Sequence, residues 1–327
     1  MTPYFSVIVP VFNRPDEVNE LLNSLQNQTY KDFEVLIVED GSTNKCDEVC
    51  NLYKDKINLQ YLYKPNSGRS ETRNYGMERA NGEYFVIFDS DVILPPKYFE
   101  IVKQSLESDY TDCYGGPDSA DDSFTDVQKA INYSMTSVMT TGGIRGATKN
   151  VDKFSPRSFN MGLSKEVFHK VGGYKNMIGE DIDLSIRIQT AGFRTKLIRE
   201  AYVYHKRRVS FKKFFKQVNT FGKGRVLLYK MHPGSLKAVH LLPMFFVCGN
   251  IDLILLSVIF MSLWPMLPIA VYILAVFIES LIKNKKLSIA FLSIISSYWQ
   301  LFGYGIGFID ELLTGSAAKS AQEKLYK

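Results

Sequence analysis

The chain has 327 residues, of which 46% are apolar and 13% aromatic, and its formal net charge is +5 at pH 7. This composition excludes an intrinsically disordered protein and supplies enough apolar side chains for one large or two ordinary domains. The four cysteines, Cys46, Cys50, Cys113 and Cys248, have neither the spacing of a zinc site nor the density of a disulfide scaffold. We therefore expect a reducing, cytosolic environment.

Residues 1–205 alternate between strand-like apolar runs and stretches with helical spacing. This alternation is typical of an α/β domain with a mainly parallel sheet. The expected strands are Tyr4–Phe12, Phe33–Asp40, Ile57–Tyr63 and Glu83–Asp91, and the expected helices are Asp16–Gln28, Cys46–Tyr53 and Glu71–Ala80.

Two of the expected strands end in pairs of acids: Glu39 and Asp40, and Asp89 and Asp91. In open α/β sheets, ligands bind beyond the carboxyl ends of the strands, so these acids should converge there. Carboxylates held close together repel each other unless a cation lies between them. A hard divalent ion, Mg²⁺ or Mn²⁺, shared with substrate phosphates would meet this need. An isolated Asp-x-Asp is weak support, because loops that follow strands use Asp for turns.

Six motifs strengthen this interpretation, because their order and spacing closely resemble those of family 2 glycosyltransferases, which are inverting enzymes of the GT-A fold. The resemblance covers about residues 4–225. The motifs are FSVIVPVFNR (5–14), VLIVEDGS (35–42), NSGRSETRNYGMERANGEYFVIFDSDV (66–92), FNMGLSKEVFHKVGGY (159–174), GEDIDLSIRIQTAGF (179–193) and VYHKRRVSF (203–211).

The resemblance implies a binding site for a nucleotide-sugar donor, with UDP as the expected nucleotide. Phe12, beside Pro10, would stack on the base, Glu39 would contact it, and Asp40 would lie next to the base or ribose. Many relatives carry Asp where this chain has Glu39. Arg73 would face the donor diphosphate, whose oxygens suit its fixed charge.

The resemblance also implies the catalytic groups. Asp89 would reach the ribose or sugar, and Asp91 would bind a divalent metal that bridges the diphosphate. Asp181 would be the general base, with Glu180 orienting the acceptor or a neighbouring donor. His205 would add a metal ligand or a diphosphate contact. The local alternative for the acids after Gly179 is a helix start that favours negative charge.

Residues 206–237 contain ten Lys or Arg and no acid. Interspersed with phenylalanines, these cations suit an amphipathic linker on anionic headgroups (206–238); nucleic-acid binding is disfavoured because membrane-length segments follow. The apolar runs Leu241–Leu263, Leu267–Ile282 and Leu287–Ile309 are expected to give two or three membrane segments within 239–313, followed by a polar tail (314–327). A buried helical hairpin is the alternative.

Positive residues mark the cytoplasmic side, which predicts a catalytic domain (1–205) on the cytosolic face of the inner membrane. The side on which the C-terminus lies stays open. The absence of the Gln-x-x-Arg-Trp motif of processive synthases favours transfer of single sugars to a lipid-linked saccharide or a lipid. A polyprenyl-phosphate glycosyltransferase and a non-catalytic nucleotide-sugar-binding membrane module are the alternatives.

Overall fold

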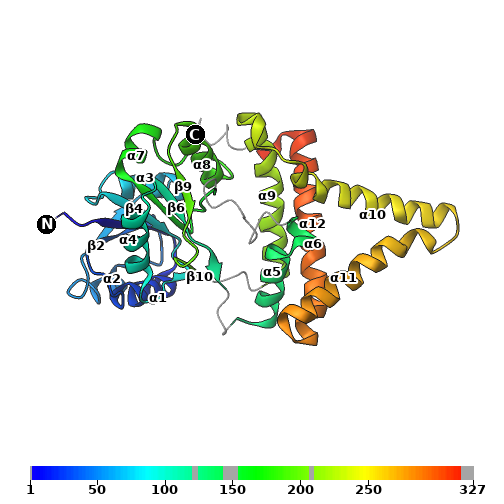
Figure 1. Cartoon of the computed structure of the whole chain (residues 1–327), viewed down its shortest axis with the longest axis horizontal. Helices are drawn as coiled ribbons and strands as arrows, with labels where there is room; N and C mark the ends of the chain where they lie inside the picture. Colours follow the sequence, from blue (N-terminus) through cyan, green and yellow to red (C-terminus); the bar gives the residue numbers. More distant parts are fainter. Residues whose placement is uncertain (1, 120–123, 143–153, 206–209, 318–327) are drawn as a thin grey trace. The chain divides into compact units, whose positions relative to one another are not determined.

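The computed structural model describes residues 2–119, 124–142, 154–205 and 210–317, and the chain divides into two compact units. Unit 1 comprises residues 1–121 and 149–206, and unit 2 comprises residues 122–148 and 207–327 (Figure 1). The sequence had placed residues 122–148 in the catalytic domain. In the structure the described part of this segment, residues 124–142, belongs to unit 2, because its helices contact the C-terminal helix Leu287–Thr314.

Unit 1 is built on a seven-stranded sheet in the order β3-β2-β1-β4-β8-β6-β9. The first four strands in this order are parallel to one another, β8 is antiparallel to β4 and β6, and β9 is parallel to β6. The expected mainly parallel sheet is therefore confirmed. The strands are β1 (Phe5–Val11), β2 (Phe33–Asp40), β3 (Leu59–Lys64), β4 (Tyr84–Phe88), β6 (Cys113–Gly115), β8 (Asn160–Ser164) and β9 (Thr195–Leu197).

Helices pack on both faces of this sheet because its central strands are apolar on both sides. In β1, Val7 and Val9 join the core formed with α1 (Pro15–Gln26), α2 (Asp47–Asn51) and α4 (Tyr98–Ser108). Ile8 points to the opposite face, which packs on α3 (Arg69–Met77), α7 (Lys165–Val171) and α8 (Glu180–Thr190). A second sheet of three short strands follows the order β5-β10-β7, with β5 at Val92–Ile93, β7 at Asp118–Ser119 and β10 at Val203–His205.

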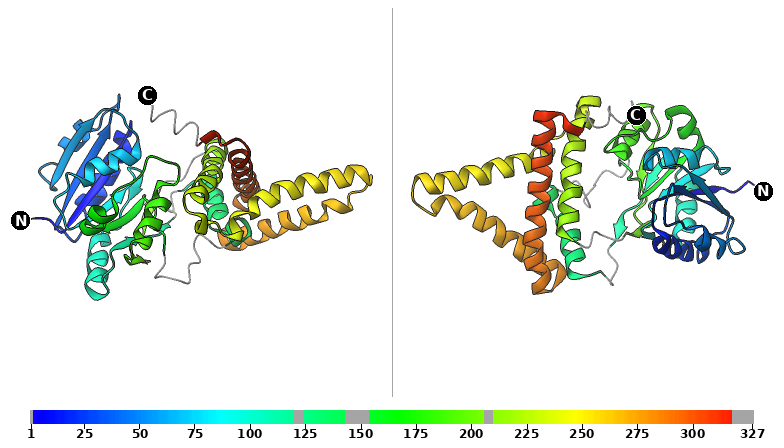
Figure 2. Two further views of the ribbon diagram at one scale, coloured as in Figure 1. Left: turned by 90° about the horizontal axis from the view of Figure 1, so that it is seen from above. Right: turned by 180° about the vertical axis from the view of Figure 1, so that it is seen from behind.

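Unit 2 is helical in its described part. It contains α5 (Asp126–Thr136), α6 (Val138–Thr141), α9 (Phe211–Met231), α10 (Leu242–Ile259), α11 (Leu267–Asn284) and α12 (Leu287–Thr314), with 3₁₀ turns at Pro233–Ser235, Ala238–His240 and Trp264–Met266. Three helices are long and apolar enough to span a membrane: Leu242–Ile259, Trp264–Asn284 and Leu287–Thr314. Figure 2 shows α10 and α11 as a hairpin that projects away from α9 and α12.

Candidate active site

The register of the parallel strands brings the predicted site residues of β1, β2 and β4 to one edge of the sheet. Val11 pairs with Glu39, and Ile8 pairs with Ile87. Pro10 lies in β1 opposite Val38, and Phe12, Asp40 and Asp89 lie at or just beyond the carboxyl ends of their strands. This edge is where ligands bind in open α/β sheets.

Asn13 joins the loops that follow β1 and β2. Its side-chain Oδ1 accepts hydrogen bonds from the backbone N–H groups of Thr43 and Asn44, both at 2.9 Å, and its own N–H donates to the Ser42 hydroxyl at 2.8 Å. Asn13 has a φ of 56°, a left-handed conformation that Asn tolerates better than most residues. Phe12, which precedes Asn13, is 51% exposed, so a planar ligand can reach its ring.

Glu39 is fully buried, and the protein itself satisfies its carboxylate. The Ser42 hydroxyl donates to Oε1, while the Cys46 N–H (2.8 Å), the Cys46 thiol (2.9 Å) and the Tyr61 hydroxyl (3.3 Å) donate to Oε2. In this geometry Glu39 holds the loop after β2. Its expected contact with the donor base stays a prediction.

Asp40 has a similar position at the end of β2. Its carboxylate accepts hydrogen bonds from Lys64 Nζ (2.6 Å) and from the backbone N–H groups of Ser67 and Gly68 (both 2.9 Å). Burial acts to raise the pKa of the Asp40 carboxyl, but these hydrogen bonds outweigh it, and the pKa lies below its ordinary value. Asp40 thereby shapes the turn that leads into α3, and its contact with the base or ribose also stays a prediction.

The buried guanidinium of Arg73 connects two motifs that are far apart in the sequence. Its Nη2 donates to Asp89 Oδ1 at 2.8 Å, and its Nη1 donates to Glu180 Oε1 at 3.0 Å. Burial acts to lower the pKa of Arg73, but the charges of Asp89 and Glu180 raise it above its ordinary value. One permanent cation therefore joins the Asp-x-Asp loop to the start of α8.

The three acids in the first turn of α8 differ in their partners. Glu180 is buried and also binds Arg69, whose Nε and Nη2 both lie 2.8 Å from its carboxylate. Asp183, also buried, pairs at 2.8 Å with Arg187, four residues further along the helix. Asp181 accepts the Ile182 N–H at 2.9 Å and lies 3.5 Å from the Arg157 guanidinium, and its side chain is partly exposed. Of the three, Asp181 has the loosest ionic contact and is the most available to a substrate.

Asp89 and Asp91 flank the turn between β4 and β5, and both side chains are partly exposed. Arg14 Nη1 lies 3.4 Å from Asp91 Oδ2 and 3.3 Å from Glu17. The two acids therefore have separate arginine partners, Arg73 and Arg14, which reduce the repulsion between them.

A divalent metal at this site would take few ligands from the protein. Within the part of the chain that the structure describes, no three His, Cys, Asp or Glu side chains gather into a metal site. The partly exposed carboxylate of Asp91 fits a hard cation that completes its shell with diphosphate oxygens and water. His205 ends β10, where its backbone pairs with Val92, next to Asp91 in the sequence. The His205 side chain lies outside the described part.

Sequence reasoning gave no role to three arginines that contact the site acids: Arg14, Arg69 and Arg157. The spacing of Arg69 and Arg73, four residues apart on α3, could have indicated that both face the same partner. No local pattern marks Arg157, because its proximity to Asp181 depends on the tertiary fold.

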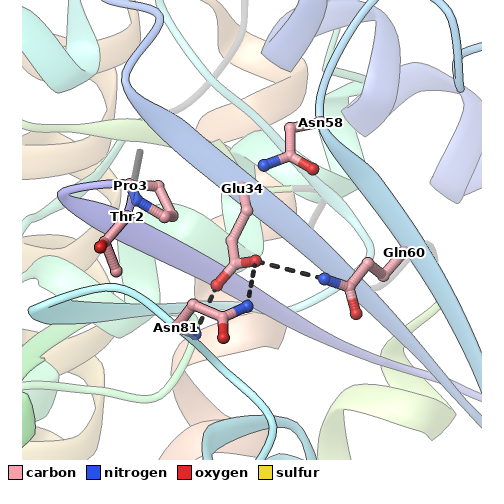
Figure 3. Close-up of a pocket in the computed structure, with 6 residues that line it drawn as sticks. All are labelled: Thr2, Pro3, Glu34, Asn58, Gln60 and Asn81. Atoms are coloured by element: carbon pink, nitrogen blue, oxygen red, sulfur yellow. Dashed lines mark hydrogen bonds between the residues drawn. The ribbon is translucent and has the colours of Figure 1, made fainter.

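A polar pocket lined by described residues lies elsewhere in unit 1. Glu34 accepts hydrogen bonds from Asn81 N (2.6 Å), Asn81 Nδ2 (3.0 Å) and Gln60 Nε2 (3.3 Å). These bonds are drawn in Figure 3. Glu34 lies near the start of β2 and Asp40 at its end, so this pocket belongs to the opposite edge of the sheet. Both oxygens of the Glu34 carboxylate accept hydrogen bonds from the protein itself. The remaining lining residues are Thr2, Pro3 and Asn58.

Comparison with known sequences gives one family. Residues 6–172, just over half of the chain, match Glycosyl transferase family 2. Glycosyltransferase AglE from Haloferax volcanii is 25% identical over 264 residues, which cover 76% of this chain and 81% of that protein. An uncharacterized glycosyltransferase from Rickettsia felis is 37% identical over 102 residues, which cover 31% of this chain and 17% of that protein. This chain thus spans about a sixth of the length of that relative.

Solved structures share the fold. The mannosyltransferase PcManGT from Pyrobaculum calidifontis, in complex with GDP-Man and Mn²⁺, has a TM-score of 0.66 at 15% identity, covering 94% of this chain and 88% of that one. Residues 1–349 of TarS from S. aureus, in complex with UDP-GlcNAc, have a TM-score of 0.51 at 18% identity, covering 94% and 91%. The expected GT-A-like fold is confirmed, and with the family match over residues 6–172 the chain belongs to glycosyl transferase family 2.

Proposed function

We propose that the protein is a membrane-bound, inverting glycosyltransferase that moves a sugar from a nucleotide-sugar, with a UDP-sugar as the expected donor, to a lipid-linked saccharide or lipid. The observation that carries the proposal is the Arg73 guanidinium, which contacts both Asp89 and Glu180, the residue before Asp181. Donor-binding and acceptor-activating groups are thereby held at one place. The bound nucleotides of the structural neighbours, UDP-GlcNAc and GDP-Man, support the donor class.

Donor binding uses the carboxyl ends of the parallel strands. The exposed Phe12 ring stacks on the base, and the loops shaped by Glu39 and Asp40 surround the nucleotide. Asp89 contacts the ribose or the sugar, held in place by its hydrogen bond from Arg73. Mg²⁺ or Mn²⁺, held by Asp91 with His205 as a second candidate ligand, would offset the charge of the leaving diphosphate.

Acceptor activation uses Asp181. Its carboxylate takes the proton from the acceptor hydroxyl while that oxygen forms a bond to the anomeric carbon. The bond from this carbon to the diphosphate oxygen breaks on the opposite face of the sugar, so the configuration inverts without a covalent sugar-enzyme intermediate. Arg157, 3.5 Å from Asp181, places one cation beside this base that an anionic acceptor could contact.

The apolar helices of unit 2 support attachment to a membrane. Lysines lie on both sides of the α10–α11 hairpin, Lys230 and Lys237 before it and Lys283, Lys285 and Lys286 at its end. Because positive residues favour the cytoplasmic side, we place the catalytic unit on the cytosolic face of the cell's inner membrane. Nucleotide sugars are available on that face, and the proposal involves no nucleic acid.

The test is transfer of labelled sugar from a panel of UDP- and GDP-sugars into a lipid extract, with wild type and Asp181→Asn. General-base removal should lower the rate by about 10²- to 10⁴-fold. Substantial activity of Asp181→Asn would favour a polyprenyl-phosphate acceptor, whose oxygen needs no base. Absence of transfer from every donor by the wild type would favour a non-catalytic nucleotide-sugar-binding module.

A further inference from the structure

Helices α9 and α12 run parallel in unit 2 with their backbones in close contact. A Cβ atom on Gly307 would lie 2.1 Å from the carbonyl oxygen of Asn219, and one on Gly222 would lie 2.1 Å from that of Tyr304. Gly303 accepts a hydrogen bond from the Asn219 side chain at 3.2 Å. The Gly303-x-x-x-Gly307 pair is thus a packing surface, and α9 and α12 lie side by side in both views of Figure 2.

Polar contacts fasten both ends of α12 to helices that are not candidate membrane spans. Near its C-terminal end, Asp310 pairs with Lys223 of α9 at 2.6 Å. At its N-terminal end, Ser288 and the preceding Lys286 donate to Asp126 of α5 at 2.6 and 2.9 Å. Because α12 is bound to α5 and α9 at its two ends, all three helices must lie at the same depth relative to a membrane.

Helix α9 does not suit the interior of a bilayer. Its sequence, FKKFFKQVNTFGKGRVLLYKM, contains six Lys or Arg and no acid. A cation at the centre of a membrane helix costs about 2.5–3.5 kcal/mol on insertion scales. Buried Phe214 and Val218 face the unit, while Lys212, Lys213 and Lys216 are exposed. This amphipathic arrangement matches a helix that lies along a headgroup layer.

The α10–α11 hairpin has the opposite character. Half of the most apolar window of α12 is buried within unit 2, compared with 17% for α10 and 11% for α11. Exposure is greatest at the tip, where Met261 is 96%, Leu263 83% and Trp264 79% exposed. Each helix has 18 residues, a length of roughly 27 Å at 1.5 Å per residue, close to the roughly 30 Å of a hydrocarbon core.

The base of the hairpin, in contrast, packs on α12. A Cβ on Gly305 would lie 2.4 Å from the carbonyl oxygen of Pro243 in the first turn of α10. In the last turns of α11, the Ser280 hydroxyl donates to that of Ser293 at 2.7 Å. The hairpin thus begins and ends at the layer formed by α5, α9 and α12.

Asp252 is the one acid in α10, and it is exposed. Inserting an aspartate into a membrane at the centre of a helix costs about 2.5–3.5 kcal/mol. The eleven Leu, Ile, Phe and Val residues of α10 each favour insertion by about 0.3–0.6 kcal/mol. Their sum is at least comparable to the cost of Asp252, so this acid alone does not exclude α10 from the membrane.

We propose that the hairpin of α10 and α11 alone enters the lipid bilayer, and that α12 is not a third crossing. Helix α12 lies with α5 and α9 along the headgroups on the catalytic side, so the C-terminal end of α12 lies on the same side of the membrane as unit 1. Trp264 marks the far interface, where tryptophan is enriched. The proposal rests on the membrane attachment proposed above and assigns its topology.

The test is labelling of single cysteines by a charged, membrane-impermeant maleimide in sealed vesicles prepared with either face outward. The background is Cys248→Ser, because Cys46, Cys50 and Cys113 are buried. Asn51→Cys, on the surface of unit 1, reports the catalytic face. Thr314→Cys reports the end of α12 and Ser262→Cys the tip of the hairpin.

We expect Thr314→Cys to react from the same face as Asn51→Cys and at a similar rate. From that face, Ser262→Cys should react at no more than about one tenth of the rate of Asn51→Cys, because the bilayer excludes a charged reagent. Reaction of Thr314→Cys from the opposite face alone would overturn the proposal, as would fast reaction of Ser262→Cys from the catalytic face. Loss of the protein from washed membranes would instead refute the membrane attachment itself.

Discussion

At the scale of single residues, the two neighbouring acids Glu180 and Asp181 have different surroundings. Glu180 is buried between two arginines, whereas Asp181 is partly exposed with one longer ionic contact. Stability should therefore depend on Glu180 and turnover on Asp181.

We predict that Glu180→Gln lowers the free energy of unfolding by on the order of 3 kcal/mol, because the buried Arg73 loses one of its two carboxylate partners. The isosteric change Asp181→Asn serves as the matched control and should alter this free energy by less than about 0.5 kcal/mol. Denaturant unfolding in detergent measures both. Equal losses for the two variants would contradict the division of roles.

Asp40 makes stability depend on pH. Because its pKa is lowered in the folded state, it stabilises the fold above about pH 4, the unfolded-state value, and this contribution disappears as the pH falls through the folded-state pKa. Asp40→Asn should unfold more easily than wild type at pH 7, and the difference should shrink below about pH 4. A difference that stays constant between these pH values would exclude this linkage.

At the scale of elements, the close contact of α9 and α12 depends on glycine. Gly307→Ala should lower stability by about 1–3 kcal/mol, because the added methyl group meets the backbone of α9. The control is Gly249→Ala on α10, where nothing other than the helix's own adjacent backbone comes within 4 Å of the added Cβ, so the change should be neutral or stabilise by up to about 1 kcal/mol. Thermal unfolding in detergent distinguishes the two, and an equal effect would argue against the packing surface.

The sequence predicted those elements best that have strong periodicity or an unbroken apolar run. Phe33–Asp40 was predicted with the bounds of β2, and the predicted run Leu267–Ile282 begins with α11 and ends two residues before that helix ends. The helix expected at Cys46–Tyr53 is shorter in the structure, where α2 spans Asp47–Asn51, because the following residues form turns. End positions depend on such local contacts, which periodicity does not encode.

The candidate site was predictable in position but not in its contacts. The acids of β2 and β4 could be placed at one sheet edge because parallel strands share that edge. The hydrogen bonds that Glu39 accepts from Ser42, Cys46 and Tyr61 could not be predicted, since these partners come from different elements. Pairing of Arg69 with Glu180 likewise joins residues 111 positions apart.

At the scale of the whole molecule, the hairpin of α10 and α11 should determine membrane binding. Leu255→Lys places a charge on the exposed apolar surface of α10, at a cost of up to about 3 kcal/mol, and should increase the fraction of protein released by an alkaline wash. Leu52→Lys makes the same change at an exposed residue of unit 1 and should not increase the fraction of protein released above that of the wild type. Equal release of both variants would show that the hairpin does not hold the protein in the membrane.

The most direct test of the nucleotide-sugar site is calorimetric binding of UDP, GDP, CMP and a set of UDP-sugars to detergent-solubilised protein, with and without Mn²⁺, for wild type and Asp91→Ala. We predict that one nucleotide class binds the wild type, that Mn²⁺ strengthens this binding, and that Asp91→Ala loses the metal dependence. If none of these nucleotides binds the wild type with or without Mn²⁺, the acids at the sheet edge do not form a donor site, and the account is contradicted.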